Sequence, residues 1–189
     1  MKEKDRPHIL GVDDAAFEKS QPAPVPIIAV MTEGADLVEN VAVTAFPVDG
    51  AAATSFLATW IEGLRLRSSL QSIVLGGITI AGLGVVDIRA LSERLALPVL
   101  VFNRKNPVNS VVCSALRSAG HADRIAIVER TPVAIELGPG RYLSWAGADE
   151  RTARHLLAVS ANKSSYPEAI RIAHLIGKAI VDGESRGRV

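Results

Sequence analysis

The chain has 189 residues, 48% of them hydrophobic, and its 21 basic and 20 acidic side chains leave a formal net charge of +1. This length and apolar content are enough for a folded core without metal or disulfide staples, and the single cysteine, Cys113, excludes an internal disulfide. The balanced charge argues against a strongly basic nucleic-acid-binding module, and 4% aromatic residues are too few for a base-stacking platform. We expect one domain over residues 1–189, no membrane span and a cytoplasmic location.

The first part of the chain predicts three strands followed by a helix. Short runs rich in valine and isoleucine, separated by turn-prone segments, occupy Ile9–Asp13, Ile27–Thr32 and Val38–Ala45. Apolar residues then recur at helical spacing over Thr54–Arg67. We therefore expect an antiparallel meander that leads into the first helix.

The middle of the chain alternates strand and helix signals. Ser72–Gly77 and Leu97–Asn103 are apolar strand candidates, a helix begins at Asp87, and Pro107–Ala119 has helical spacing. Such strand–helix–strand units place successive strands parallel through right-handed crossovers. The predicted fold class is therefore α/β with a mixed central sheet, antiparallel first and parallel later.

The last part of the chain predicts a hairpin addition and a terminal helix. Ile125–Glu129, Val133–Leu137 and Arg141–Ser144 have the character of short strands. The final helix is expected to start at an S-x-x-E capping box, Ser165–Glu168.

The segment Gly82–Asp87 lies between a predicted strand and a predicted helix, as in dinucleotide-binding proteins. Asp87 occupies the third glycine position of the G-x-G-x-x-G pattern, and its carboxylate would repel a pyrophosphate. Asp87 is better interpreted as a helix N-cap. Nucleotide binding through the glycine-rich segment Gly76–Gly84 is kept as an alternative. No metal-binding spacing is present among the four histidines, which are expected to be structural or solvated: His8, His121, His155 and His174.

Three aspartates form the most informative pattern. Asp13 and Asp14 are adjacent at the end of the first predicted strand, and Asp49 follows the third strand before the first helix. Converging carboxylates bind hard cations such as Mg²⁺, and they repel one another without a cation. The alternative is that Asp49 belongs to a turn and Asp14 to a cap.

Five segments resemble an archaeal family known as domain of unknown function 99. In chain order they read ILGVDDAAF, FPVDGAAATSF, IVLGGITIAGLGVVDI, LPVLVFNRKNP and YPEAIRIAHLIGKAI, and they span most of the sequence. That family is similar to endonuclease V, a Mg²⁺-dependent nuclease that acts beside deaminated bases. The resemblance implies a three-layer, ribonuclease-H-like fold in a single endonuclease-V-like domain.

The resemblance also implies site residues. Asp13 matches the aspartate of the G-V-D motif, and Asp49 lies near the acidic residue before the first helix, so these two, with Asp14 beside them, are the expected ligands of Mg²⁺ or Mn²⁺. Arg104 or Lys105 would replace the active-site lysine as a phosphate clamp. Gly76 falls where the nuclease has its third metal carboxylate. The expected function is metal-dependent binding or hydrolysis of DNA or RNA, and the alternative is an inactive nucleic-acid- or protein-binding module.

Overall fold

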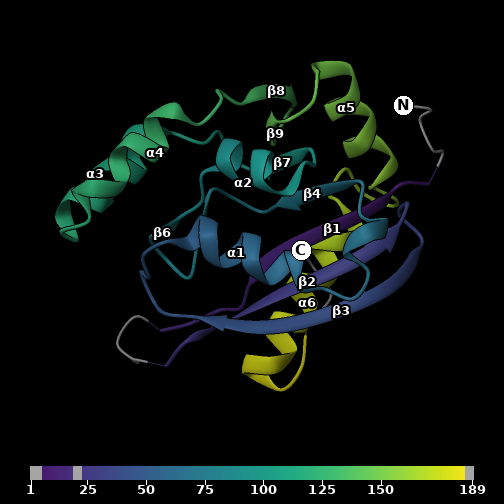
Figure 1. Cartoon of the computed structure of the whole chain (residues 1–189), viewed down its shortest axis with the longest axis horizontal. Coiled ribbons are helices and arrows are strands. Elements are labelled where there is room, and N and C mark those ends of the chain that lie inside the picture. Colours follow the sequence, from purple (N-terminus) through teal and green to yellow (C-terminus); the bar gives the residue numbers. More distant parts are fainter. Residues whose placement is uncertain (1–5, 19–22, 186–189) are drawn as a thin grey trace.

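The computed structural model describes residues 6–18 and 23–185. Within these residues, seven strands form one sheet in the order β3-β2-β1-β4-β7-β9-β8 (Figure 1). Their bounds are β1 His8–Asp14, β2 Val25–Glu33, β3 Leu37–Phe46, β4 Ser72–Leu75, β7 Val99–Asn103, β8 Ile135–Gly138 and β9 Arg141–Ala146. Strands β1 to β3 form an antiparallel meander, and β4 and β7 continue the sheet parallel to β1. The predicted mixed sheet is confirmed.

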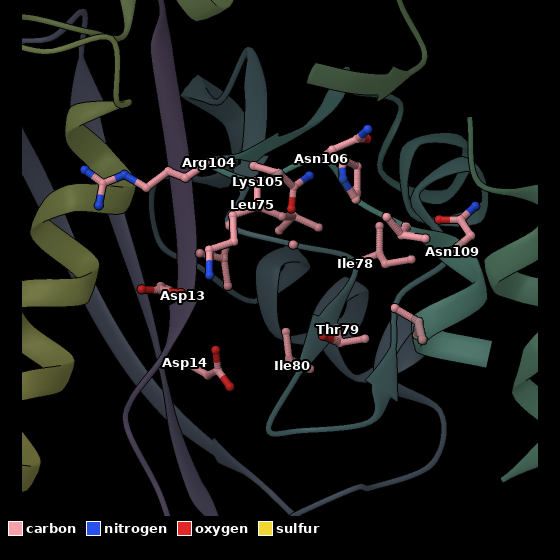
Figure 2. A pocket seen from close by; sticks show the side chains of 17 residues that line it. Asp13, Asp14, Leu75, Ile78, Thr79, Ile80, Arg104, Lys105, Asn106 and Asn109 are labelled. Carbon is pink, nitrogen blue, oxygen red and sulfur yellow. The ribbon is translucent and has the colours of Figure 1, made fainter. Parts of the chain in front are cut away.

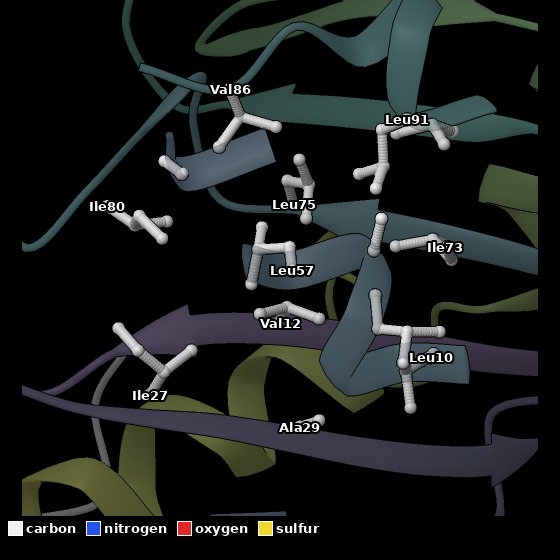
Figure 3. Packing of buried hydrophobic residues seen from close by; sticks show 14 of the residues in the cluster. Leu10, Val12, Ile27, Ala29, Leu57, Ile73, Leu75, Ile80, Val86 and Leu91 are labelled. Atoms are coloured by element: carbon white, nitrogen blue, oxygen red, sulfur yellow. The ribbon is translucent and has the colours of Figure 1, made fainter. Parts of the chain in front are cut away.

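Helices cover both faces of the sheet and give a three-layer arrangement (Figure 1). The helix bounds are α1 Ala53–Glu62, α2 Ile88–Leu95, α3 Asn109–Ser118, α4 Ile125–Arg130, α5 Glu150–Val159 and α6 Glu168–Asp182. Side chains of β1 alternate between the layers, because successive residues of a strand point to opposite faces. Leu10 and Val12 pack in the core under α1 and α2, whereas Ile9 packs with α5 and α6. Figure 3 shows Leu57 of α1 between Val12 and Leu75.

Two segments differ from the sequence prediction. Ile125–Glu129, expected as a strand, belongs to α4. Its buried Val128 and the partly buried Ile125 stand three residues apart and pack with Leu116 of α3, so a helical spacing satisfies both. Helix α5 was not predicted, although Asp149 caps it by accepting a hydrogen bond from Thr152 N at 2.7 Å.

The start of α6 also differs from the prediction. The helix begins at Glu168, and Pro167 at its N-cap makes no side-chain capping bond. Glu168 instead forms an ion pair with Arg171, 2.7 Å away, so the expected capping box is not formed. Among the residues that the structure describes, no helix is long and apolar enough to cross a membrane.

Candidate functional site

The site predicted from sequence lies at the edge of the sheet where three parallel strands end. Asp13 and Asp14 end β1, Gly76 follows β4, and Arg104 and Lys105 follow β7. Because β1, β4 and β7 are parallel, their carboxyl ends meet at one edge, where open α/β sheets bind ligands. All five residues line a cavity of about 520 Å³ (Figure 2).

The Asp13 carboxylate is largely buried and has a close basic neighbour. His174 Nδ1, on α6, lies 3.1 Å from Asp13 Oδ2. Burial, reinforced by the negative charge of Asp14, raises the pKa of the Asp13 carboxyl from its ordinary 3.8 to about 6, and His174 acts in the opposite direction. A cation in the cavity would favour the charged form of Asp13.

Asp14 lines the same cavity and is held from another side. Its Oδ2 accepts a hydrogen bond from Ala81 N at 2.8 Å. Burial raises the pKa of the Asp14 carboxyl, while this hydrogen bond lowers it. Asp13 and Asp14 therefore both line the cavity, and their carboxylates are held from different sides, Asp13 by His174 of α6 and Asp14 by the backbone of Ala81.

Asp49 stands outside the described lining of this cavity. Its Oδ1 accepts a hydrogen bond from Leu83 N at 2.7 Å, and its own backbone N donates to Ala81 O at 2.8 Å. Gly82, with φ +94°, leaves room for this carboxylate, since a Cβ there would lie 2.3 Å from Asp49 Oδ1. These contacts hold the turn at 81–83, and a metal-binding role for Asp49 stays a prediction.

The glycine-rich segment forms a hairpin, in which β5 (Thr79–Ile80) pairs antiparallel with β6 (Gly84–Val85). At the start of α2, the predicted cap is confirmed: Asp87 Oδ1 accepts hydrogen bonds from the backbone N of Arg89 and Ala90, at 3.1 and 3.2 Å. The carboxylate thus occupies the N–H groups that a phosphate would need. The nucleotide-binding alternative has no support at this helix.

Arg104 is positioned against an aromatic ring beside the cavity. Its guanidinium carbon lies 5.0 Å from the centroid of the Tyr166 ring, which contacts Phe102 edge-on at 5.4 Å between centroids. Burial raises the pKa of Tyr166 to about 12, and the negative charge of Asp13 acts in the same direction, so Tyr166 stays neutral. In Figure 2, Arg104 extends toward the side of the cavity where Asp13 lies.

His174 is a site residue that the sequence did not indicate. Helix α6 reaches the end of β1 because Gly11 lets the helix approach the strand: a Cβ at Gly11 would lie 2.4 Å from the backbone carbon of Ala169. His174 is one turn after Ile170, whose side chain is buried under the sheet. A histidine one helical turn from a buried position was the available signal, but no spacing linked it to Asp13.

Asp13 and Asp14 are the residues that could hold a metal ion in the cavity. Within the described part of the chain, no group of three or more histidine, cysteine, aspartate or glutamate side chains is placed to do so. Gly76 stands beside Asp13, since a Cβ there would lie 3.3 Å from Asp13 Oδ1, and it supplies no carboxylate. One or two carboxylates with substrate phosphate are a usual ligand set for Mg²⁺, which keeps several waters. The donors present fit that set.

Comparisons with known proteins show the family of this chain and the proteins that share its fold. A family model described as endonuclease dU matches residues 5–181. The UPF0215 protein of Methanothermobacter thermautotrophicus is 35% identical, over 97% of this chain and 92% of its own length. A solved structure of a protein of unknown function from Archaeoglobus fulgidus superposes with a TM-score of 0.85 at 30% identity, covering 93% of this chain and 99% of that one.

Endonuclease V structures share the fold at low identity. The Ciona intestinalis enzyme, solved with a 24mer DNA containing an inosine followed by a ribo-adenosine, aligns with a TM-score of 0.58 and 11% identity. The alignment covers 94% of this chain and 87% of that chain. The three-layer fold expected from the sequence resemblance is therefore confirmed.

Proposed function

This chain belongs to the endonuclease dU family, and from that premise we propose that it is a divalent-metal-dependent nuclease acting on nucleic acid that contains deoxyuridine. The observation that carries the proposal is that one cavity is lined by Asp13 and Asp14 together with Arg104 and Lys105. Carboxylates that hold a cation, beside basic side chains that bind phosphate, are the parts that phosphodiester hydrolysis requires.

Each residue has a defined task in this proposal. Asp13 and Asp14 would hold Mg²⁺ or Mn²⁺, which when bound supplies Lewis-acid activation of water and stabilises the leaving oxygen. Lys105 binds a phosphate oxygen as a point charge, and Arg104 orients the phosphate through its planar guanidinium, which Tyr166 supports.

His174 positions the Asp13 carboxylate. Its Nδ1 contacts Oδ2, while Oδ1 is the oxygen on the side of Gly76. With Oδ2 engaged by the ring, Oδ1 is the oxygen available to a ligand in the cavity.

A second candidate is a nucleic-acid-binding module without hydrolysis. Gly76, in place of a third carboxylate beside Asp13 Oδ1, favours it, because two carboxylates offer a divalent cation fewer protein ligands than three. In this candidate the cavity binds the phosphate of a damaged strand and leaves its bonds intact.

Cleavage of defined oligonucleotides tests the proposal. The protein is incubated with Mg²⁺ or Mn²⁺ and a single-stranded or duplex substrate. The DNA substrates carry one deoxyuridine or deoxyinosine, and the RNA substrates carry one uridine or inosine. We expect cleavage at the deoxyuridine strand, its loss in EDTA and in Asp13→Asn, and its retention in the control Asp36→Asn, whose side chain is exposed and lies outside the cavity. Binding without cleavage under every condition would support the second candidate.

A further inference from the structure

A smaller cavity adjoins the cavity that contains the carboxylates. Its volume is about 90 Å³, and five residues line both spaces: Ile78, Asn103, Asn106, Pro107 and Asn109. Figure 2 shows Asp13 and Asp14 on one side of the larger cavity, with Ile78, Asn106 and Asn109 on the other. A nucleotide could thus place its phosphate in the first space and its base in the second.

The walls of the smaller cavity suit a planar, polar-edged ring. Ile78, Pro107 and Pro132 supply apolar surface, and the amides of Asn103 and Asn106 supply hydrogen-bonding groups. Enzymes that act at a flipped base read its Watson–Crick edge with polar groups and enclose its faces with apolar or aromatic ones. The combination fits a nucleobase better than a purely apolar or purely anionic ligand.

The amide of Asn109 has a defined orientation. Asn109 Nδ2 donates a hydrogen bond to Val128 O at 3.2 Å, so the amide oxygen and nitrogen are distinguished by their partners rather than interchangeable. In Figure 2 the oxygen of Asn109 lies on the side of the cavity and the nitrogen on the far side. Because Asn109 lines both cavities, the chain presents a fixed acceptor, Oδ1, where the two spaces adjoin.

A fixed acceptor distinguishes a deaminated base from its parent. Cytosine has an unprotonated ring nitrogen, N3, that can only accept a hydrogen bond, whereas uracil carries N3–H, which donates one. The oxygen of Asn109 would accept the uracil N3–H and would repel the cytosine N3 lone pair. Hypoxanthine, the deamination product of adenine, has a corresponding N1–H. Asn109 does not separate uracil from thymine, which has the same N3–H.

We infer that the smaller cavity is the base pocket of this protein: it receives a uracil base, Asn109 Oδ1 accepts the uracil N3–H, and Asn103 and Asn106 donate to the uracil carbonyl oxygens. The inference rests on the proposed function in one respect, that the phosphate of the same nucleotide occupies the cavity of Asp13 and Lys105. The recognition step itself requires no hydrolysis.

Equilibrium binding in EDTA tests the pocket separately from catalysis. A fluorescein-labelled single-stranded oligonucleotide carries one deoxyuridine, one deoxycytidine or one abasic tetrahydrofuran residue at the same position. We expect the intact protein to bind the deoxyuridine strand more tightly than both others. Asn109→Ala should lose roughly tenfold in affinity for the deoxyuridine strand, since the N3–H is left without its acceptor, and should bind the abasic strand as before.

Two further variants make the test decisive. Asn162→Ala is the matched control, because its amide donates to Asp36 Oδ1 and lies outside both cavities, and it should keep the full preference for uracil. Asn106→Ala should weaken the same preference as Asn109→Ala. Thermal melts of each variant check folding.

The outcomes separate the inference from the proposed function. Equal affinity of the intact protein for the deoxyuridine and abasic strands would overturn the base pocket, even if the protein cleaves DNA. A uracil preference that survives in both Asn109→Ala and Asn106→Ala would also overturn it. A uracil preference that these variants abolish would support the pocket even if no divalent cation produces cleavage, in which case only the hydrolysis would be rejected.

Discussion

His174 Nδ1 lies 3.1 Å from Asp13 Oδ2, although 161 positions separate the two residues in the sequence. The contact joins α6 to the end of β1 at the cavity. It couples the placement of the last helix to the charge of the carboxylate that the proposed chemistry needs.

Replacing His174 should change the protonation of Asp13. Because His174 lowers the pKa of the Asp13 carboxyl, His174→Ala should raise this pKa above its present value of about 6. Carboxyl-carbon NMR titration in EDTA measures it directly. His121→Ala serves as the control, since His121 is not among the groups that act on Asp13. An unchanged Asp13 titration in His174→Ala would contradict the proposed coupling between His174 and the Asp13 carboxyl.

The stability of the metal-free protein should depend on the charge of Asp13. The pKa of this carboxyl is raised on folding from 3.8 to about 6, so the native state binds a proton more strongly than the unfolded chain between these pH values. The Asp13 carboxyl makes its whole contribution to the free energy of unfolding below pH about 4, and this contribution is lost as pH rises through about 6. The difference corresponds to roughly 3 kcal/mol at most.

Asp13→Asn removes that dependence. Urea unfolding at several pH values in EDTA measures the free energy of unfolding of both proteins. Between pH about 4 and 6 the value for the variant should rise relative to that of the parent, and above pH 6 it should be the larger of the two. Asp36→Asn, at an exposed position, should follow the parent. Parallel curves for Asp13→Asn and the parent would contradict the expected cost of burying this carboxylate.

Gly76→Asp should tighten divalent binding. A Cβ at Gly76 would lie 3.3 Å from Asp13 Oδ1, so the new carboxylate would stand beside Asp13 and repel it unless a cation is present. We expect a lower melting temperature than the parent in EDTA and a larger rise on addition of Mg²⁺, as linkage requires for a ligand bound only by the folded state.

The control for that variant is Gly63→Asp, at the end of α1 and outside the cavity. It adds the same charge and should respond to Mg²⁺ as the parent does. Equal Mg²⁺-induced shifts in Gly76→Asp and the parent would show that position 76 does not contribute to a cation site.

Gly11→Ala should displace α6. The added methyl group would lie 2.4 Å from the backbone carbon of Ala169, so the helix must move away from β1, and such overpacking lowers stability by roughly 1–3 kcal/mol. Gly63→Ala, whose Cβ would lie 3.5 Å from Trp60 O, should change stability little. Urea unfolding of both variants measures the difference. A loss no larger at Gly11 than at Gly63 would contradict the close approach of α6 and β1.

The sequence by itself determined the features that depend on neighbouring residues. Strand and helix periods identified the meander and the parallel strands, because each element buries one face or both, and burial leaves a local pattern. The cap at Asp87 is likewise a contact between residues three positions apart or fewer. The family resemblance grouped Asp13 with Arg104 and Lys105, and the parallel direction of their strands places them at one edge of the sheet.

Only the tertiary structure decided the features that depend on how elements pack. Ile125–Arg130 is too short for its period to distinguish strand from helix, and its contact with α3 selected the helix. Asp49 and Asp13 were both expected as metal ligands, but Asp49 is bound by the turn at 81–83 and is absent from the cavity lining. His174 reaches Asp13 because Gly11 admits α6. Such contacts join distant parts of the chain, and the spacing of residues along the sequence does not show which distant parts meet in space.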